Sequence, residues 1–129
     1  MAALAARLET IPGLRTALGF PNSISPPVAV VGYPDVRYDL TMRRGGDTLL
    51  WEVTLVVSKA TERGARVALL PYLRPSGASS VKEAVDGDVP GVVDFFRVVR
   101  ARPAQEFAFD NVNYLGVIFE VESVVSWTG

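Results

Sequence analysis

The sequence predicts an α+β fold: a single mixed, mostly antiparallel β-sheet with two or three short helices packed on one face. Two long stretches in which apolar and polar residues alternate predict the main strands, and two short helical segments lie between them. Strands on both sides of such helices are typical of a sheet whose helices are segregated to one face. With 129 residues and no linker or internal repeat, the chain is expected to form one domain over residues 1–129.

The first quarter of the chain predicts one helix and two strands. Leu4, Leu8 and Ile11 recur at helical spacing in an alanine-rich opening, which predicts an amphipathic helix over residues 2–10. Pro12-Gly13 is expected to end this helix. Three segments follow in order: a short strand at 14–18, a Pro/Ser-rich loop at 19–27, and a buried β-branched strand at 28–31.

A hairpin is predicted next. Its arms are Tyr38–Met42 and Thr48–Ser58, on either side of the turn-rich run Arg43-Arg44-Gly45-Gly46-Asp47. The second arm alternates, and its apolar side consists of Leu49, Trp51, Val53, Leu55 and Val57. Its other side contains Thr48, Glu52, Thr54 and Ser58. This pattern predicts one buried sheet face and a second face that is wet or meets a partner.

Two short helices are expected in mid-chain. Thr61 is the predicted N-cap of a helix that runs to about Leu73, and Pro71 is expected to kink or end it. The residues of this helix that face inward are expected to be Ala65, Leu69 and Tyr72 or Leu73. Ser80-Val-Lys-Glu83 matches a capping box, which predicts a second helix that ends near Asp86-Gly87.

The rest of the sheet is predicted from the last third of the chain. The β-rich stretches are residues 93–102, 105–109 and 112–126, with a turn at Asp110-Asn111 between the last two. One side of the final strand consists of Leu115, Val117, Phe119, Val121 and Val125, and the other carries Tyr114, Ile118, Glu120 and Glu122. Arg97 differs in parity from Arg100 and Arg102, so these three are not expected to share a strand face.

The composition excludes several classes of function. The chain has no His and no Cys, which removes disulfides, thiolate nucleophiles, imidazole metal ligands and His-dependent catalytic triads. We therefore expect a protein that is not an enzyme and binds no cofactor or metal. A net charge of −1 lacks the basic excess of a dedicated nucleic-acid binder. No segment predicts a signal peptide or a membrane span, and an apolar content of 49% favours surfaces buried against other subunits.

Three groups of residues could still carry chemistry. Ser79 and Lys82 have the spacing at which a lysine can activate a serine, and Asp86-Gly-Asp88 resembles the start of a calcium loop. Glu120 and Glu122 could face a substrate together. Each group lacks a partner: the supporting serine-enzyme motifs are absent, Pro and Arg occupy two calcium-ligand positions, and nothing indicates a sugar cleft. Helix caps, a helix-ending loop and solvated carboxylates are the favoured explanations.

Four blocks of the sequence carry a resemblance to a known family. They are Ser25-Pro-Pro-Val-Ala-Val-Val-Gly32, Tyr38-Asp-Leu-Thr-Met-Arg-Arg-Gly-Gly-Asp47, Ala60-Thr-Glu-Arg-Gly-Ala65 with Pro71-Tyr-Leu73, and Ser76-Gly-Ala-Ser-Ser-Val-Lys-Glu-Ala-Val85. They resemble small neck proteins of long-tailed, siphovirus-type bacteriophages, in particular the tail terminator family. The order of elements is also similar, from an opening helix to closing strands with Leu115-Gly116. The resemblance covers most of the chain and includes no catalytic signature.

The resemblance implies a structural role in a virion that is assembled in the host cytoplasm. Tail terminators are compact α+β subunits that form a hexameric ring on the finished tail tube, stop its polymerisation and offer the surface that joins the head connector. The implied partners are other copies of the chain, the major tail tube protein and the head–tail connector or stopper protein, with DNA only passing through the lumen and no membrane. Another neck component, such as a head-completion or stopper protein, is the closest alternative. A small ligand-binding α+β domain is the other.

Exposure and chemistry predict three contact elements for such an assembly. They are the hairpin tip at 43–47, the loop at 75–79 and the outward side of the last strand. The candidate interface residues are Arg43, Arg44, Asp47, Ser76, Ser79, Tyr114, Ile118, Glu120 and Glu122.

Overall fold

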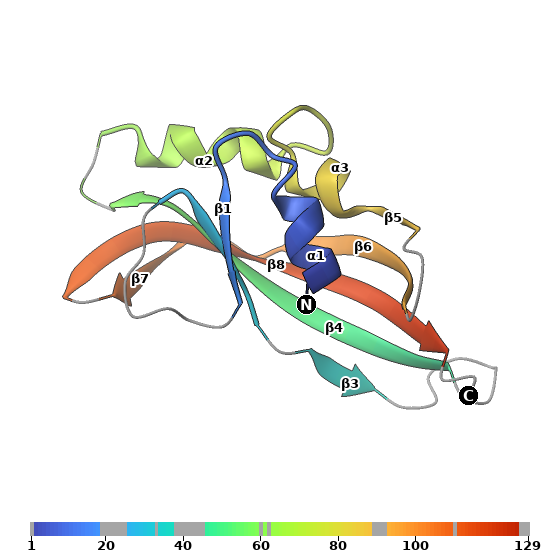
Figure 1. Ribbon diagram of the computed structural model, residues 1–129. Helices are drawn as coiled ribbons and strands as arrows, with labels where there is room; N and C mark the ends of the chain where they lie inside the picture. The colour runs from blue at the N-terminus through green and yellow to red at the C-terminus, as the bar shows by residue number, and fades with distance from the viewer. Residues whose placement is uncertain are drawn as a thin grey trace.

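An eight-stranded β-sheet with three short helices on one face makes up the described part of the computed structural model (Figure 1). The structure describes residues 2–18, 26–32, 34–37, 46–59, 61, 63–88, 93–109 and 111–126. The helices are α1 (Ala2–Leu8), α2 (Ala65–Leu73) and α3 (Val81–Val85). The strands are β1 (Arg15–Leu18), β2 (Val28–Val31), β3 (Asp35–Arg37), β4 (Gly46–Lys59), β5 (Gly87–Asp88), β6 (Val93–Ala101), β7 (Gln105–Phe109) and β8 (Val112–Ser126).

The long antiparallel pair of β4 and β8 forms the centre of the sheet. The strand order is β1-β2-β4-β8-β6-β5, with β3 paired to β4 and β7 paired to β8. β1 and β2 are parallel, whereas the other described pairs are antiparallel. The predicted class, a mixed and mostly antiparallel sheet with helices on one face, is therefore confirmed.

The core lies between the helices and the sheet. β4 and β8 contribute the apolar sides that their alternation predicts: Leu49, Trp51, Val53, Leu55 and Val57 from β4, and Leu115, Val117, Phe119 and Val121 from β8. Trp51 meets Phe96 edge to face, with ring centroids 6.4 Å apart. Its Nε1 donates to Ser123 Oγ at 2.9 Å. This bond satisfies the one polar atom that the buried indole brings into the core.

The opposite face of β4 is only partly polar. Thr54 and Val56 are buried on that side, and β2 places Val30 and Val28 directly opposite them. Both faces of the sheet are therefore buried along β2. The prediction of a wet or partner-facing side was wrong at Thr48 and Thr54, which are both buried, because alternation along β4 does not reveal the strands beside it. Glu52, farther along β4, is exposed as predicted.

The start of α2 differs from the prediction, whereas its end at Leu73 agrees with it. Thr61 does not cap the helix; the N-cap is Gly64, whose φ of 79° is left-handed, and no side chain caps it. A left-handed residue interrupts any helix that begins at Thr61, and glycine adopts this conformation without steric cost. The helix also continues through Pro71 to Leu73. Pro71 removes only the hydrogen bond to the carbonyl of Val67, and water can satisfy that carbonyl because Val67 is exposed.

The helix α3 begins as the capping-box pattern predicts. Ser80 Oγ accepts a hydrogen bond from Glu83 N at 3.1 Å. Val81 and Val85 are buried against the core, which anchors the helix although it has only five residues. Asp86 follows at the C-cap, so the helix ends where predicted.

Candidate assembly surfaces

The predicted hairpin tip lies mostly outside the described residues. The strand β3 pairs with β4 and covers Asp35–Arg37, just before the predicted first arm Tyr38–Met42. Arg43 and Arg44 lie outside the described part of the chain, as does the predicted arm. Asp47 belongs to β4, but its side chain is not among those described. The role of Arg43, Arg44 and Asp47 in assembly therefore stays a prediction.

The loop between α2 and α3 carries two of the predicted contact residues. Ser76 is exposed, and Ser79 is half-buried. Gly77 N donates a hydrogen bond to Glu83 Oε2 at 2.8 Å, which ties the loop to the first turn of α3. Both serines are thus presented on a backbone that α3 constrains.

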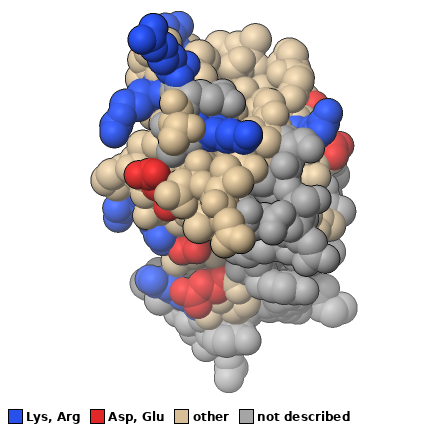
Figure 2. Space-filling view, turned by 90° about the vertical axis from the view of Figure 1, so that its left-hand side faces the viewer, with Lys and Arg blue, Asp and Glu red and all other residues tan. Residues whose placement is uncertain are grey.

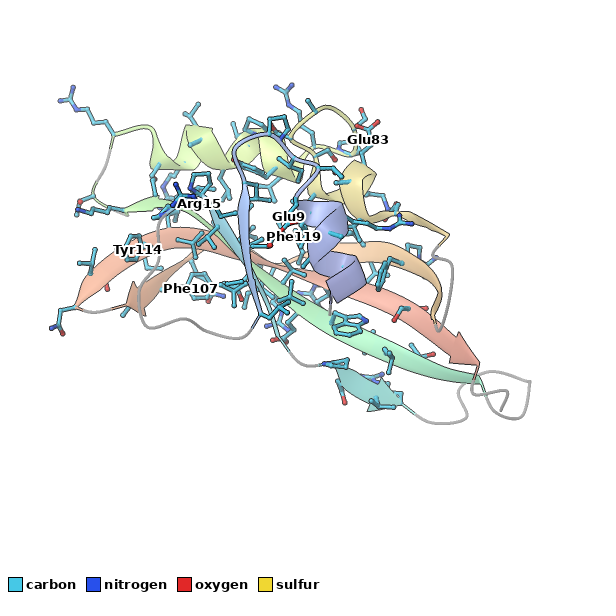
Figure 3. The ribbon with its side chains drawn as sticks, in the orientation of Figure 1. Glu9, Arg15, Glu83, Phe107, Tyr114 and Phe119 are labelled. Carbon is cyan, nitrogen blue, oxygen red and sulfur yellow. The ribbon has the colours of Figure 1, made fainter. Side chains whose placement is uncertain are left out.

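The four predicted residues of β8 lie on one side of the strand, at alternate positions: Tyr114, Ile118, Glu120 and Glu122. Their surroundings differ. Tyr114 lies opposite Phe107 of β7, near the end of the sheet where β7 pairs with β8 (Figure 3). Ile118 is half-buried opposite Thr54. The four residues therefore do not form one uniform surface.

Three arginines neutralise the carboxylates at the far end of this side. Glu52 and Glu120 lie directly opposite each other on β4 and β8, and Arg102 binds both. Its Nε is 3.1 Å from Glu120 Oε2, and its Nη2 binds Glu52 Oε1. The hydrogen bonds of Glu120 and then Glu52 raise the pKa of Arg102 above its ordinary value. Arg102 thus separates two carboxylates whose direct opposition would destabilise the sheet.

Two further ion pairs extend this row of charges. Arg100 Nε lies 3.2 Å from Glu120 Oε2, and Arg97 Nη2 lies 3.5 Å from Glu122 Oε2. We call the six residues the charged sheet face: Glu52, Arg97, Arg100, Arg102, Glu120 and Glu122. The two glutamates of β8 are predicted contact residues, and the structure places them in ion pairs within the chain.

A β-bulge brings the arginines to one face, contrary to the prediction from parity. Val98 and Arg100 pair with successive residues of β8, so the strand accommodates Val99 as an extra residue. The bulge reverses the alternation of side chains along β6. Arg100 therefore lies on the same face as Arg97, and the prediction that they differ was wrong. The three arginines still form no basic stripe, because glutamates pair with each of them.

Side chains near α3 hold the bulge in place. Asp86 Oδ1 accepts a hydrogen bond from Val98 N at 2.8 Å, and Lys82 Nζ donates to Val98 O at 3.1 Å. Lys82 Nζ also binds Asp86 Oδ2 at 2.7 Å. The two side chains bond the backbone of Val98, which pairs with Val121 of β8 and directly precedes the extra residue Val99. Lys82 and Asp86, considered above for catalysis and calcium binding, are thus engaged structurally, and within the described ranges no three acidic side chains gather as a metal site.

A hollow of about 360 Å³ lies beside the charged sheet face. Its charged lining includes Asp35, Arg37, Glu52, Arg102 and Glu120. Arg102 binds both glutamates, and Arg37 Nε lies 4.0 Å from Asp35 Oδ2. Each of these charges already has a partner within the described chain, which leaves the hollow poorly suited to bind a charged ligand.

The helix α2 presents a second, apolar face to solvent. Val67, Leu70 and Leu73 are 67%, 54% and 39% exposed. Ala65 and Leu69 are buried on the inner side, as predicted. Of the two alternatives for the last inward position, Tyr72 is the half-buried one, and burial raises the pKa of its phenol.

Three arginines border this apolar face. Arg63, Arg66 and Arg74 are exposed, and none of them pairs with a carboxylate in the described part of the chain. In Figure 2 the uppermost charged side chains are basic, on the side where Figure 1 shows α2, and the acidic ones lie lower. We call the six residues the α2 face: Arg63, Arg66, Val67, Leu70, Leu73 and Arg74.

The α2 face was not among the predicted contact elements, although the sequence holds a signal for it. The run Val67-Ala-Leu-Leu-Pro-Tyr-Leu73 is apolar around the whole helix. A helix that lies on a sheet needs an apolar stripe on one side only, so the surplus indicates a second contact. The predicted inward residues account for only one side of α2, and the apolar residues on its other side had no predicted contact.

Comparisons with protein families and with curated proteins identified no relative of this chain. No protein-family model matches the sequence, and no curated protein matches it. None of the helices in the described ranges is long and apolar enough to cross a bilayer. What the chain offers to a partner therefore follows from its own surfaces.

Proposed function

We propose that the chain is a tail terminator, a structural virion protein that caps the tail tube of a long-tailed phage as a ring. In this role it ends tube polymerisation and provides the surface for joining to the head connector. The observation that carries the proposal is the α2 face, where three large apolar side chains lie exposed on one nine-residue helix. Such clusters on a small domain favour association with other proteins.

The state of the charged groups also supports a structural role. Lys82 and Asp86 hold a bulge, and the glutamates of the charged sheet face are paired with arginines. Catalytic carboxylates and lysines need a free position next to a substrate. A protein that works by surface complementarity needs no such free group. It needs a rigid subunit with a face whose apolar and charged side chains are available to a partner.

Ring formation sets a further requirement on the subunit. A ring arises from a heterologous contact, in which one patch meets a different patch of the next copy. The tail tube protein and the head–tail connector or stopper protein would then meet the two ends of the ring. The resemblance described above suggests a hexamer with DNA passing through its lumen.

Deletion of the gene from the phage tests this function. We expect particles with overlong or uncapped tails, and expression of the wild-type chain should restore the normal length. Normal tail length in the deletion would contradict the proposal. Full-length tails beside unjoined heads would instead identify a head-completion or stopper protein.

A further inference from the structure

We propose that the α2 face docks into a hollow at the junction of α1 and α3 of the next copy. This inference deepens the proposed ring assembly and rests on it. The hollow measures about 260 Å³ and is lined by Thr10, Gly77, Ala78, Ser80, Glu83 and Ala84. It combines small apolar walls with a carboxylate, the complement of an apolar face bordered by arginines.

The charge of the α2 face disfavours its packing against itself. A symmetric contact would bring Arg63, Arg66 and Arg74 of two copies together without a described carboxylate between them. Like charges facing each other across an interface are strongly unfavourable. We therefore expect the α2 face to meet a different surface, which would make the contact heterologous and allow a ring to close.

The complementary charge is present elsewhere on the same chain. The formal net charge is −1 and the three arginines contribute +3, so the rest of the chain carries −4. Among the described carboxylates, Glu9, Glu83 and Glu106 form no salt bridge. Glu106 and Arg66 of its own copy line one hollow. Among the described carboxylates this leaves Glu83 and Glu9, whose Oε1 accepts a hydrogen bond from Thr16, for a neighbour.

Glu83 is positioned to receive a guanidinium. Its Oε2 accepts a hydrogen bond from Gly77 N, which fixes the side chain and leaves Oε1 available as an acceptor. Figure 3 shows Glu83 at the outer side of α3 and Glu9 at the end of α1. Thr10, which follows Glu9, lines the same hollow as Glu83. In the docked pair, Leu70 would lie against Ala78 and Ala84 while Arg66 and Arg74 approach these two glutamates.

The absence of cysteine from the chain allows a direct test by engineered disulfides. Leu70→Cys and Ala78→Cys are made separately, and the purified proteins are mixed under mild oxidation. We expect a disulfide-linked dimer from the mixture and little or none from Leu70→Cys alone, because the α2 faces do not meet each other. Cysteine Cα atoms must come within about 7 Å to form the bond, so a product reports close contact.

Two controls make the result specific. Val99→Cys replaces another exposed apolar residue, distant in sequence from α2, and should give little product with Ala78→Cys. Arg66→Glu with Arg74→Glu, added to the Leu70→Cys chain, should lower the yield with Ala78→Cys about tenfold, whereas Lys59→Glu should not. Circular dichroism of each variant checks that a lower yield does not come from unfolding.

The outcomes separate this inference from the proposed function. Three outcomes would each overturn the docking of α2 into the hollow. They are a Leu70→Cys homodimer, a yield from Val99→Cys with Ala78→Cys equal to that from Leu70→Cys with Ala78→Cys, and no dimer from the latter mixture. Wild-type rings seen by negative-stain microscopy without the disulfide product would leave the terminator function standing with a different contact. Normal tails in the gene deletion would remove the function itself.

Discussion

The charged sheet face and the α2 face each carry three arginines, and the two regions use them in opposite ways. On the sheet, Arg97, Arg100 and Arg102 reach glutamates of β4 and β8 at distances up to 3.5 Å. On the α2 face, Arg63, Arg66 and Arg74 form no ion pair with a described carboxylate. The sheet arginines are paired within one chain, whereas the arginines of the α2 face have no ion-pair partner among the described residues.

This difference shows that residue type alone does not reveal which charged groups are paired within the chain. The two glutamates of β8 were predicted as contact residues, and they form ion pairs within the chain. The apolar residues of α2 were considered only for the core, and three of them lie exposed. Which polar groups find partners depends on strand register, and register is a property of the folded chain. Changes in the sheet region should therefore affect stability, and changes on the α2 face should affect assembly.

The largest contrast is expected between two neighbouring leucines of α2. Leu69→Ala should lower the free energy of unfolding by about 3 kcal/mol, because Leu69 is buried and its truncation leaves a cavity. Leu70→Ala should change it by less than about 0.5 kcal/mol, because Leu70 is exposed, while ring formation by this variant should be weakened. Urea denaturation and particle mass in solution measure the two effects. Equal stability losses would mean that α2 has no free outer face.

Gly116 tests how closely β4 and β8 approach. A Cβ at this position would collide with the backbone carbonyl of Leu55 and press on the ring of Phe107. Gly116→Ala should therefore cost about 2–3 kcal/mol of stability, since a backbone atom cannot move aside easily. Gly32→Ala is the matched control, because a Cβ there lies 3.5 Å from Glu52 O, an ordinary contact. If both variants denature at the wild-type urea concentration, the strand spacing described here is wrong.

Asp86 tests whether the region near α3 holds the bulge of β6. Asp86→Ala removes the acceptor of Val98 N and the partner of Lys82, and should cost about 1.5–2 kcal/mol. Asp35→Ala is the control, because it removes an exposed carboxylate 4.0 Å from Arg37 and should cost less than about 0.5 kcal/mol. Amide exchange at Val98, followed by NMR, should quicken in Asp86→Ala alone. Unchanged exchange there would refute the role of Asp86.

Much of the fold could be predicted from the sequence because its strongest pattern is alternation. The strands at 93–102, 105–109 and 112–126 were placed within one residue of β6, β7 and β8. The cap at Ser80 followed from a local hydrogen bond between residues three apart. Features that depend only on neighbours in the chain, such as strand periodicity and caps, are readable in this way.

The bulge could not be predicted in this way, because the side chains that bond its backbone lie far away in the sequence. The bulge at Val99 follows Val98, whose backbone is bonded by Asp86 and Lys82, more than ten residues earlier. Without it, parity places Arg97 and Arg100 on different faces, and the charged sheet face cannot be foreseen. The left-handed Gly64 likewise moved the start of α2 away from Thr61. The predicted contact residues were correctly aligned on β8, but their arginine partners came from a strand whose register was unknown.

The smallest effect is expected at Arg102, and it tests whether the charged sheet face is self-contained. Arg102→Met keeps the aliphatic stem but leaves Glu52 and Glu120 facing each other, so stability should fall by less than in Asp86→Ala. Adding Glu52→Gln should recover part of the loss, because the repulsion then disappears. High salt should also reduce the loss, since it screens the repulsion between exposed charges. The disulfide yield between Leu70→Cys and Ala78→Cys should stay unchanged in this background. A lower yield would mean that the charged sheet face also takes part in assembly, and the division between the two regions would fail.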